Sequence, residues 1–162
     1  MATEYRVGSG WDSHLFVPER RLWLGGMEIA HPLGLAGHSD GDVLLHAICD
    51  ALLGAIGEGD IGTHFSSADP RWHNAHSEQF VRHAAQLIRR DGWSIVNLDA
   101  NLILELPRIQ PLREALREGV GSLLEIPSDR ISIKGKTPEG LASVQAAIAH
   151  VVVLLRRETS GV

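Results

Sequence analysis

The stretch from Gly34 to Leu53, GLAGHSDGDVLLHAICDALL, joins a polar loop to a strongly apolar helix, and we interpret it as the part around which the chain is organised. Within it Ser39 is followed three residues later by Asp42, a capping-box type of pattern that predicts a helix opening near Asp40. The first backbone N–H groups of such a helix are unpaired and point back at His38 and Ser39. The pattern therefore predicts a cradle for a phosphate or a carboxylate at this end of the helix.

One histidine interrupts the apolar character of this helix. His46 lies four residues after Asp42 and four before Asp50, so the three side chains share one polar stripe. A metal-bound histidine needs such neighbours, because one ring nitrogen binds the metal while an acceptor orients the other. The alternative is a helix histidine that a neighbouring aspartate holds for solubility or packing. This stretch alone favours the alternative, so other parts of the chain have to decide.

A second group of candidate ligands lies near the N-terminus. Residues 5–8, YRVG, have the character of a strand that runs on into SGWDSHLF, so Asp12 and His14 project from the same face. Together with His46 they would supply two imidazoles and one carboxylate. This set suits Zn²⁺ and leaves a fourth position open for a substrate oxygen. For the Asp-x-His motif alone, the alternative is a turn aspartate beside an exposed histidine.

The composition excludes several functional classes. A chain of 162 residues, 44% hydrophobic and 22% charged, predicts one globular domain over residues 1–162. A formal charge of -5 argues against sequence-independent binding of nucleic acid. The single cysteine, Cys49, predicts a buried inert thiol in a reducing compartment. Because no signal peptide and no membrane-length apolar run is visible, we predict a cytoplasmic protein without a membrane partner.

The remaining sequence alternates between strands and helices. Trp23-Leu24 and residues 27–29 flank two glycines and predict a short hairpin. The pattern then predicts helices at about 77–91 and 111–124, strands at about 93–106, 130–134 and 147–155, and a tail from 156. We therefore expect an α/β (α+β) sandwich, in which a mixed β-sheet carries its helices on one face. The other face would lack a cover, which favours an oligomer.

Two predicted loops carry side chains suited to a phosphorylated ligand. In residues 57–70, Asp60 can accept from ribose-like hydroxyls, and Ile61 and Phe65 can wall an apolar patch. The loop GKTPEG at 135–140 offers an amine, a hydroxyl and a carboxylate, which can bind a phosphate ester and, through Glu139, a hard divalent cation. A plain connector and a solvated lysine-rich turn are the alternatives for these two loops.

Several motifs together resemble one known family. They are GWDSH at 10–14, HSDGDVLLHA at 38–47, DALLG at 50–54, GDIG at 59–62 with Phe65, LPR at 106–108 and KTPEGL at 136–141. In this order the chain is similar, over nearly its whole length, to the 2-C-methyl-D-erythritol 2,4-cyclodiphosphate synthase family of the non-mevalonate isoprenoid pathway. The HSDGD block followed by His46, with Asp-x-His upstream, is the most specific part of the resemblance.

The resemblance implies roles for individual residues. Asp12, His14 and His46 would be the Zn²⁺ ligands, and Glu139 would bind a Mg²⁺ or Mn²⁺ ion that bridges two substrate phosphates. His38 and Thr137 would be the catalytic residues that stabilise the phosphorus during transfer. The implied contacts to the substrate as a whole are Asp12, Ser13, His14, His38, Ser39, Asp60, Ile61, Gly62, Phe65, Leu104, Leu106, Pro107, Lys136, Thr137, Pro138 and Glu139.

The resemblance also implies a reaction and an assembly. The substrate would be 4-diphosphocytidyl-2-C-methyl-D-erythritol 2-phosphate, whose 2-phosphate attacks the β-phosphorus of its cytidine diphosphate group. CMP leaves and a cyclic diphosphate forms. The implied assembly is a homotrimer with active sites between subunits, in which the cytidine pocket comes from the adjacent chain. Two other interpretations of the same ligands are a metal-dependent phosphatase and a trimeric protein with a structural zinc ion.

The chain departs from the family pattern in several places. Ser9 stands where many members carry histidine, and residues 66–68 read Ser-Ser-Ala in place of the more usual Pro-Asp-Thr. The glycine-rich stretch with an arginine that usually follows the position of Leu141 is absent. Lys136 stands where a hydroxyl residue is more common, and we predict that it supplies the missing positive charge.

Overall fold

The computed structural model describes residues 2–140 and 145–159. The strands are β1 (Ala2–Val17), β2 (Leu22–Leu24), β3 (Met27–Ile29), β4 (Gly34–Leu35), β5 (Ser94–Ile103), β6 (Ile131–Lys136) and β7 (Ala146–Thr159). The helices are α1 (Val43–Ile56), α2 (Ile61–His64), α3 (Glu78–Arg90) and α4 (Arg113–Leu124), with short 3₁₀ turns at Pro70–Trp72, Gln110–Leu112 and Ser128–Arg130. The departure from the family pattern after Leu141 falls at residues outside the described part of the chain.

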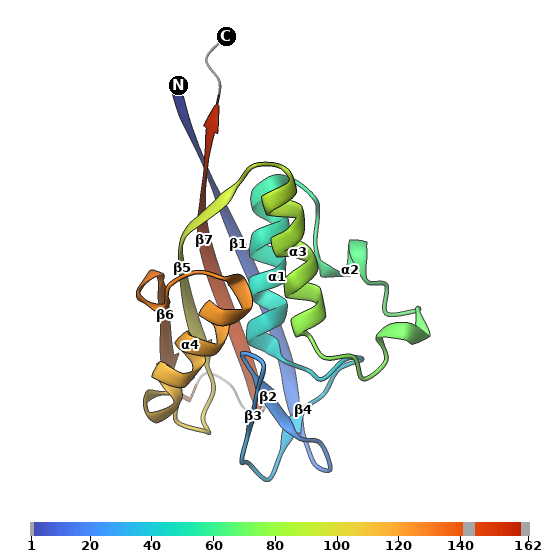
Figure 1. Cartoon of the computed structure of the whole chain (residues 1–162). Coiled ribbons are helices and arrows are strands. Elements are labelled where there is room, and N and C mark those ends of the chain that lie inside the picture. Colours follow the sequence, from blue (N-terminus) through green and yellow to red (C-terminus); the bar gives the residue numbers. More distant parts are fainter. Residues whose placement is uncertain (1, 141–144, 160–162) are drawn as a thin grey trace.

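Five of the strands form one mixed sheet. Its order is β4-β1-β7-β5-β6, and only the β5–β6 pair is parallel. Helices α1, α3 and α4 lie on one face of this sheet, and β1 and β7 run side by side toward the two ends of the chain (Figure 1). The prediction of a mixed sheet with its helices on one face is therefore confirmed. Among the described residues, no helix is long and apolar enough to cross a membrane.

Strand β1 and helix α1 approach each other closely, because the strand carries glycine where the two meet. A Cβ atom built on Gly8 would lie 1.9 Å from the carbonyl oxygen of Ala51, and one built on Gly10 would lie 1.9 Å from that of Ala47. Helix α1 is buried along most of its surface, as expected for an apolar helix at the centre of a core. The glycines thus fix how near β1 lies to the middle of α1.

The face of the sheet away from the helices exposes several large apolar side chains. Side chains alternate along a strand, so Asp12 and His14 share the helix-facing side of β1 with the glycines. The large apolar side chains left exposed in this chain include four from β1 and one from β7: Tyr5, Val7, Trp11, Leu15 and Val152. An apolar patch of this kind is typical of a protein–protein contact.

The β2–β3 hairpin is tied to the start of α1 by one buried carboxylate. Gly25 and Gly26 adopt positive φ angles of 61° and 81° at the turn, as the glycine pair in the sequence predicts. Their backbone N–H groups donate to Asp42, which also accepts the N–H of Leu45 and so caps α1. Helix α1 therefore begins at Val43, and the prediction that it opens near Asp40 with a capping box was wrong. The predicted anion cradle holds the chain's own Asp42 carboxylate instead.

Other predicted elements differ from the structure mainly at their ends. Strand β7 continues to Thr159, so the predicted tail from residue 156 is partly strand, because β1 pairs with it as far as Ala2. Strand β5 is shorter than predicted and ends at Ile103. Residues 57–70 were predicted to be loop throughout, but they contain α2 and the start of a 3₁₀ turn. Asp60 and Asp69 cap these two short elements with their side chains.

We predict that Gly10→Ala destabilises the fold, because the new methyl group has no space against the backbone of Ala47. Overpacking of this kind lowers the free energy of unfolding by about 1–3 kcal/mol, and contact with rigid backbone places the expected loss at the upper end. Urea unfolding followed by circular dichroism measures it. The control is Gly54→Ala within α1, where the nearest atom lies 3.9 Å away and alanine favours the helix by about 0.5–1 kcal/mol. Equal stability of the two variants would contradict the close-approach argument.

Candidate metal centre

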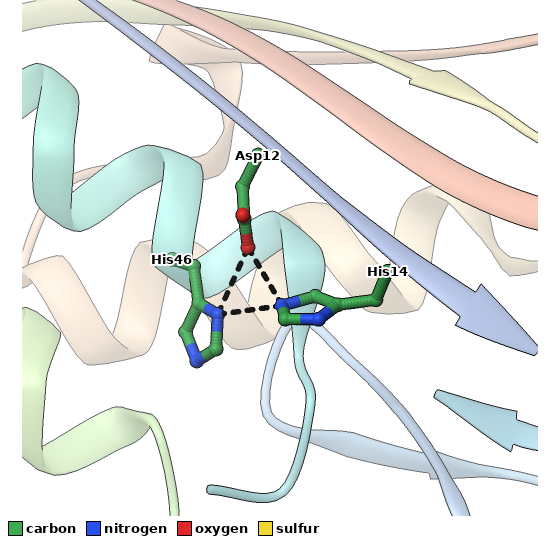
Figure 2. Close-up of side chains that lie close together, drawn as sticks. All are labelled: Asp12, His14 and His46. Atoms are coloured by element: carbon green, nitrogen blue, oxygen red, sulfur yellow. Dashed lines mark hydrogen bonds and ion pairs between the residues drawn. The ribbon is translucent and has the colours of Figure 1, made fainter. Parts of the chain in front are cut away.

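Three predicted ligands from two elements meet on the helix-facing side of β1. Asp12 and His14 come from β1 and His46 comes from α1, and their side chains point toward one another (Figure 2). Asp12 Oδ2 lies 2.8 Å from His14 Nε2 and 2.9 Å from His46 Nδ1, and the two ring nitrogens are 3.0 Å apart. Among the described residues this is the one group of three or more histidine, cysteine or carboxylate ligands close enough to share an ion.

The geometry of this triad fits a divalent cation. Bonds of about 2.0–2.1 Å with tetrahedral angles place neighbouring ligand atoms roughly 3.3 Å apart. The three observed separations are shorter than this by a few tenths of an ångström, so small side-chain rotations would bring all three atoms to bonding distance. The donor set of two imidazoles and one carboxylate leaves room for a further ligand, as in catalytic rather than structural zinc sites. The triad is therefore a candidate site for a divalent metal.

The groups that orient His46 are hydroxyls, and not the aspartates that the sequence pattern predicts. His46 Nε2 lies 2.9 Å from Ser39 Oγ and 2.9 Å from Ser77 Oγ. Asp50, one helical turn after His46, instead accepts the backbone N–H of Ile61 at 2.7 Å. Asp42 is used in the cap of α1, so the prediction that it shares the task of holding His46 was wrong.

Charge and burial act against each other at the triad. Burial disfavours the charged form of Asp12, but hydrogen bonds and Coulomb attraction from His14 and His46 outweigh it and hold the pKa of Asp12 well below its usual range. Burial also disfavours the imidazolium form of His46, yet the hydrogen bond and charge of Asp12, with smaller contributions from Asp42 and Asp40, raise the pKa of His46. Metal-free triad residues therefore stabilise one another as an ion pair.

The loop before α1 places the other residues of the HSDGD block. His38 is exposed, and its ring lies 6.5 Å from that of His73. Ser39 is buried, with its hydroxyl at His46, so a contact from this hydroxyl to substrate stays a prediction. Arg20 donates to the carbonyl oxygens of Gly37 and Ser39, which fixes the loop from outside. No sequence signal pointed to Arg20.

The predicted apolar and hydroxyl-binding loop forms a small aromatic cluster. Phe65 packs against Phe80 and Trp72, with ring centroids 4.6 Å and 5.1 Å away. Asp60 Oδ1 accepts from the backbone and hydroxyl of Thr63, so at least one carboxylate oxygen serves the loop itself. Binding of substrate by Asp60, Ile61, Gly62 and Phe65 stays a prediction. Ser13 also stays one, since its side chain projects to the opposite face of β1 from the triad.

Cys49 matches its prediction as a buried thiol. It lies in α1 with no exposed surface, and its thiol faces the carbonyl oxygen of Phe80 at 3.6 Å. Burial, with the negative charges of Asp50 and Asp60, raises the pKa of Cys49 to about 12. The thiolate is therefore scarce at neutral pH, and a nucleophilic role is disfavoured.

A second group of predicted residues lines a cavity at the far edge of the sheet. This cavity has a volume of about 740 Å³ and lies beside β6. Its lining includes Leu104, Pro107, Lys136 and Thr137, as well as three further cationic residues, Arg108, Arg113 and Lys134. Strands β7 and β5 separate β6 from β1, so the cavity edge and the triad strand lie roughly 14 Å apart across the sheet.

The other residues predicted to bind substrate or metal lie outside this cavity. Leu106 and Pro138 line another cavity, of about 430 Å³, together with Phe16, His31 and Leu33. Glu139 is exposed, and its carboxylate accepts a hydrogen bond from the Thr137 hydroxyl. The structure therefore unites three of the predicted metal ligands, whereas Glu139 is not part of a ligand cluster among the described residues.

Comparison with known proteins gives one consistent family. The model of the YgbB family matches residues 5–156. The 2-C-methyl-D-erythritol 2,4-cyclodiphosphate synthase of Koribacter versatilis is 50% identical over 152 residues, which cover 94% of this chain and 98% of that protein. The enzyme of the same name from Xylella fastidiosa is 48% identical, over 94% of this chain and 88% of that protein. A solved synthase structure described as a CDP-bound form has a TM-score of 0.87 and 43% identity, and it covers 93% of this chain and 99% of that one.

We predict that metal-free protein is most stable between about pH 4 and pH 6.5. The pKa of Asp12 is lowered on folding, so its contribution is present above the unfolded value of about 3.9 and is lost as the pH falls through the folded value. The pKa of His46 is raised, so its contribution is present below about 6.5 and is lost as the pH rises through the folded value. On either side of this window the free energy of unfolding should decrease by up to about 1.4 kcal/mol per pH unit.

Urea unfolding of chelator-treated protein between pH 5 and pH 9 measures the alkaline side of this window. Asp12→Asn removes the charge that raises the pKa of His46, so the decrease above pH 6.5 should become shallower in this variant. The same slope in both proteins would show that another group causes it.

Proposed function

We propose a reaction for this chain from one premise: the chain belongs to the YgbB family, in which its curated relatives are 2-C-methyl-D-erythritol 2,4-cyclodiphosphate synthases. The chain is accordingly an enzyme of isoprenoid precursor biosynthesis, a lyase that acts on a phosphorus–oxygen bond. It converts 4-diphosphocytidyl-2-C-methyl-D-erythritol 2-phosphate to the 2,4-cyclodiphosphate and CMP. Residues 1–162 would form a single synthase domain, and the compartment we propose is the cytoplasm.

The observation that carries this proposal is the convergence of Asp12, His14 and His46. These residues belong to the motifs GWDSH and HSDGDVLLHA, which are distant in sequence and meet in space. We propose Zn²⁺ as the ion they hold, since neutral imidazole nitrogens and one carboxylate suit it. When bound, this ion supplies positive charge that attracts and orients a phosphate oxygen of the substrate.

The reaction brings two negatively charged phosphates of one molecule together, so its barrier is one of repulsion and positioning. The 2-phosphate oxygen forms a new bond to the β-phosphorus, and the bond from that phosphorus to the oxygen of CMP breaks. No covalent intermediate with the protein is needed. His38 is exposed in the loop before α1. Its ring and the Thr137 hydroxyl would donate hydrogen bonds to the phosphoryl oxygens whose negative charge grows in the transition state. These are their proposed catalytic roles.

The cavity beside β6 is the proposed site for the cytidine diphosphate half. Leu104 and Pro107 offer apolar walls, while Lys136, Arg108 and Arg113 supply positive charge. Cationic side chains form their strongest hydrogen bonds with phosphate oxygens, which suits a diphosphate in this cavity. Leu106 and Pro138 would contribute from the neighbouring cavity. Glu139, exposed next to Thr137, would bind a Mg²⁺ or Mn²⁺ ion together with the substrate phosphates.

We propose a homotrimer with each active site between two chains. Two features support it. Tyr5, Val7 and Trp11, on the face of the sheet away from the helices, are exposed in a single chain and would be covered in an assembly. The β6 cavity and the metal triad also lie at opposite edges of one sheet, so a neighbouring chain is well suited to supply the cavity that adjoins a given triad.

The test is a product assay with the cytidylyl substrate. In a buffer that contains Mg²⁺, we expect the cyclic diphosphate and CMP in equal amounts, with activity absent from protein stripped by a chelator beforehand and restored by added Zn²⁺. His46→Ala should show near-background activity that Zn²⁺ does not restore, because one of three ligands is absent. Release of inorganic phosphate without a cyclic product would indicate a metal-dependent phosphatase instead. Full activity in the chelated protein would remove the role proposed for the triad.

Lys136 gives a second prediction, because it stands where the family more commonly has a hydroxyl residue and it lines the proposed nucleotide cavity. We expect Lys136→Ala to raise the KM for the substrate roughly ten-fold, the scale of one lost charge-assisted hydrogen bond at an exposed position. Lys136→Arg keeps the charge and should stay within about three-fold of the wild type. Steady-state kinetics compare the two variants, and unchanged turnover and affinity in Lys136→Ala would refute the role of this lysine.

A further inference from the structure

Ser77 occupies a helix N-cap position but does not cap its helix. It precedes α3 and is fully buried, and its side chain makes no hydrogen bond to the first turn. An N-cap serine ordinarily accepts a backbone N–H with its hydroxyl. Here the hydroxyl faces His46 Nε2 at 2.9 Å and Asp40 Oδ1 at 2.5 Å instead. The serine therefore serves a contact outside its own helix.

The carboxylate of Asp40 decides the direction of these hydrogen bonds. Asp40 is buried, and both of its oxygens accept backbone N–H groups, Oδ1 from Asp42 at 3.0 Å and Oδ2 from Ser77 at 2.8 Å. A carboxylate only accepts, so the Ser77 hydroxyl donates its single proton to Oδ1. Toward His46 the same oxygen can then only accept. It follows that Nε2 of His46 carries a hydrogen in both the neutral and the protonated form of the ring.

Once the proton that Nδ1 shares with Asp12 is released, Nδ1 is the nitrogen of His46 left with a free lone pair. Nδ1 is also the atom that faces Asp12 and His14 in the triad. Metal-binding histidines commonly have their second nitrogen oriented by an acceptor of this kind, and loss of the acceptor typically weakens metal affinity 10- to 100-fold.

Ser39 offers a comparison at the same ring atom. Its hydroxyl also lies 2.9 Å from His46 Nε2, but its other contacts are long, 3.4 Å to Ser77 Oγ and 3.5 Å to the N–H of Gly41. None of these contacts fixes where its proton points. Ser39 can therefore donate or accept, and it imposes no tautomer on the ring.

We propose that Ser77, anchored by Asp40, is a positioning residue that fixes the His46 tautomer and so prepares Nδ1 to bind the metal. The inference rests on the metal-binding part of the proposed function. His46 on α1 is then linked by hydrogen bonds to Ser77, at the start of α3, and through it to Asp40, in the loop before α1. Neither Asp40 nor Ser77 touches the substrate in this role.

The test is the Zn²⁺ affinity of chelator-stripped protein, measured without substrate by competition with a chromophoric chelator. We expect Ser77→Ala to bind Zn²⁺ 10- to 100-fold more weakly than the wild type. Ser39→Ala is the matched control, since it removes a hydroxyl at the same distance from the same atom, and it should lose less than three-fold. Ser77→Ala retains the backbone bond to Asp40 and removes no cap, so α3 should form normally, as circular dichroism can verify.

The wild-type protein offers a measurement that needs no variant. In the Zn²⁺-loaded protein, proton NMR should show the His46 ring hydrogen on Nε2, protected from exchange and close to the Ser77 hydroxyl. Wild-type affinity in Ser77→Ala, an equal loss in Ser39→Ala, or a ring hydrogen on Nδ1 would each overturn the proposal while leaving the synthase reaction standing. Absence of Zn²⁺ binding by the wild type would instead remove the proposed metal site itself.

Discussion

The contact between β1 and α1 is the constraint on which the site depends. Gly8 and Gly10 let the strand backbone lie directly against the carbonyl oxygens of the helix. Two residues further along the strand, on the same face, Asp12 reaches His46. Even one added methyl group at Gly10 would move the strand away from the helix that carries the third ligand. The packing of the β1 backbone on α1 therefore sets the distances between the three ligands.

Four aspartates lie on or next to α1, and each has a different set of hydrogen-bond partners. Asp42 closes the N-terminus of α1 and holds the hairpin turn, and burial raises its pKa despite three backbone hydrogen bonds. Asp50 accepts the backbone N–H of Ile61 and so fixes the start of α2. Asp12 faces the imidazoles, and Asp40 directs the hydroxyl of Ser77. A buried polar group has to be paired, so these partners could not be exchanged without cost.

In the proposed function, the single chain carries two separated halves of a site. The metal triad lies on β1 near one edge of the sheet, and the cationic cavity lies beside β6 at the other. The bare apolar face of the same sheet suggests how copies would associate to bring such halves together. The uncovered apolar side chains and the separation of the triad from the cavity both support the proposed assembly of this chain.

Sequence periodicity determined the order of the main elements, the helix-covered mixed sheet and the triad. Period-two alternation places Asp12 and His14 on one face of a strand wherever that strand lies, because it is a local property of extended backbone. The ligand types suggested His46 as the third member, and the motif resemblance then implied the same three residues as Zn²⁺ ligands. The short helix α2, the end of β7 and the cap of α1 were not predicted correctly, since hydrogen bonds to distant partners decide where such elements begin and end.

The partners of His46 are the clearest case of what tertiary structure alone decided. Spacing along α1 suggested Asp42 and Asp50, which are neighbours in helical geometry. The structure gives both of them backbone N–H partners and brings Ser77 to His46 from another helix, 31 residues away. A sequence shows which side chains share a helix face, whereas the packing of one helix on another selects which polar atoms meet. Only the fold could therefore show which group holds the ring.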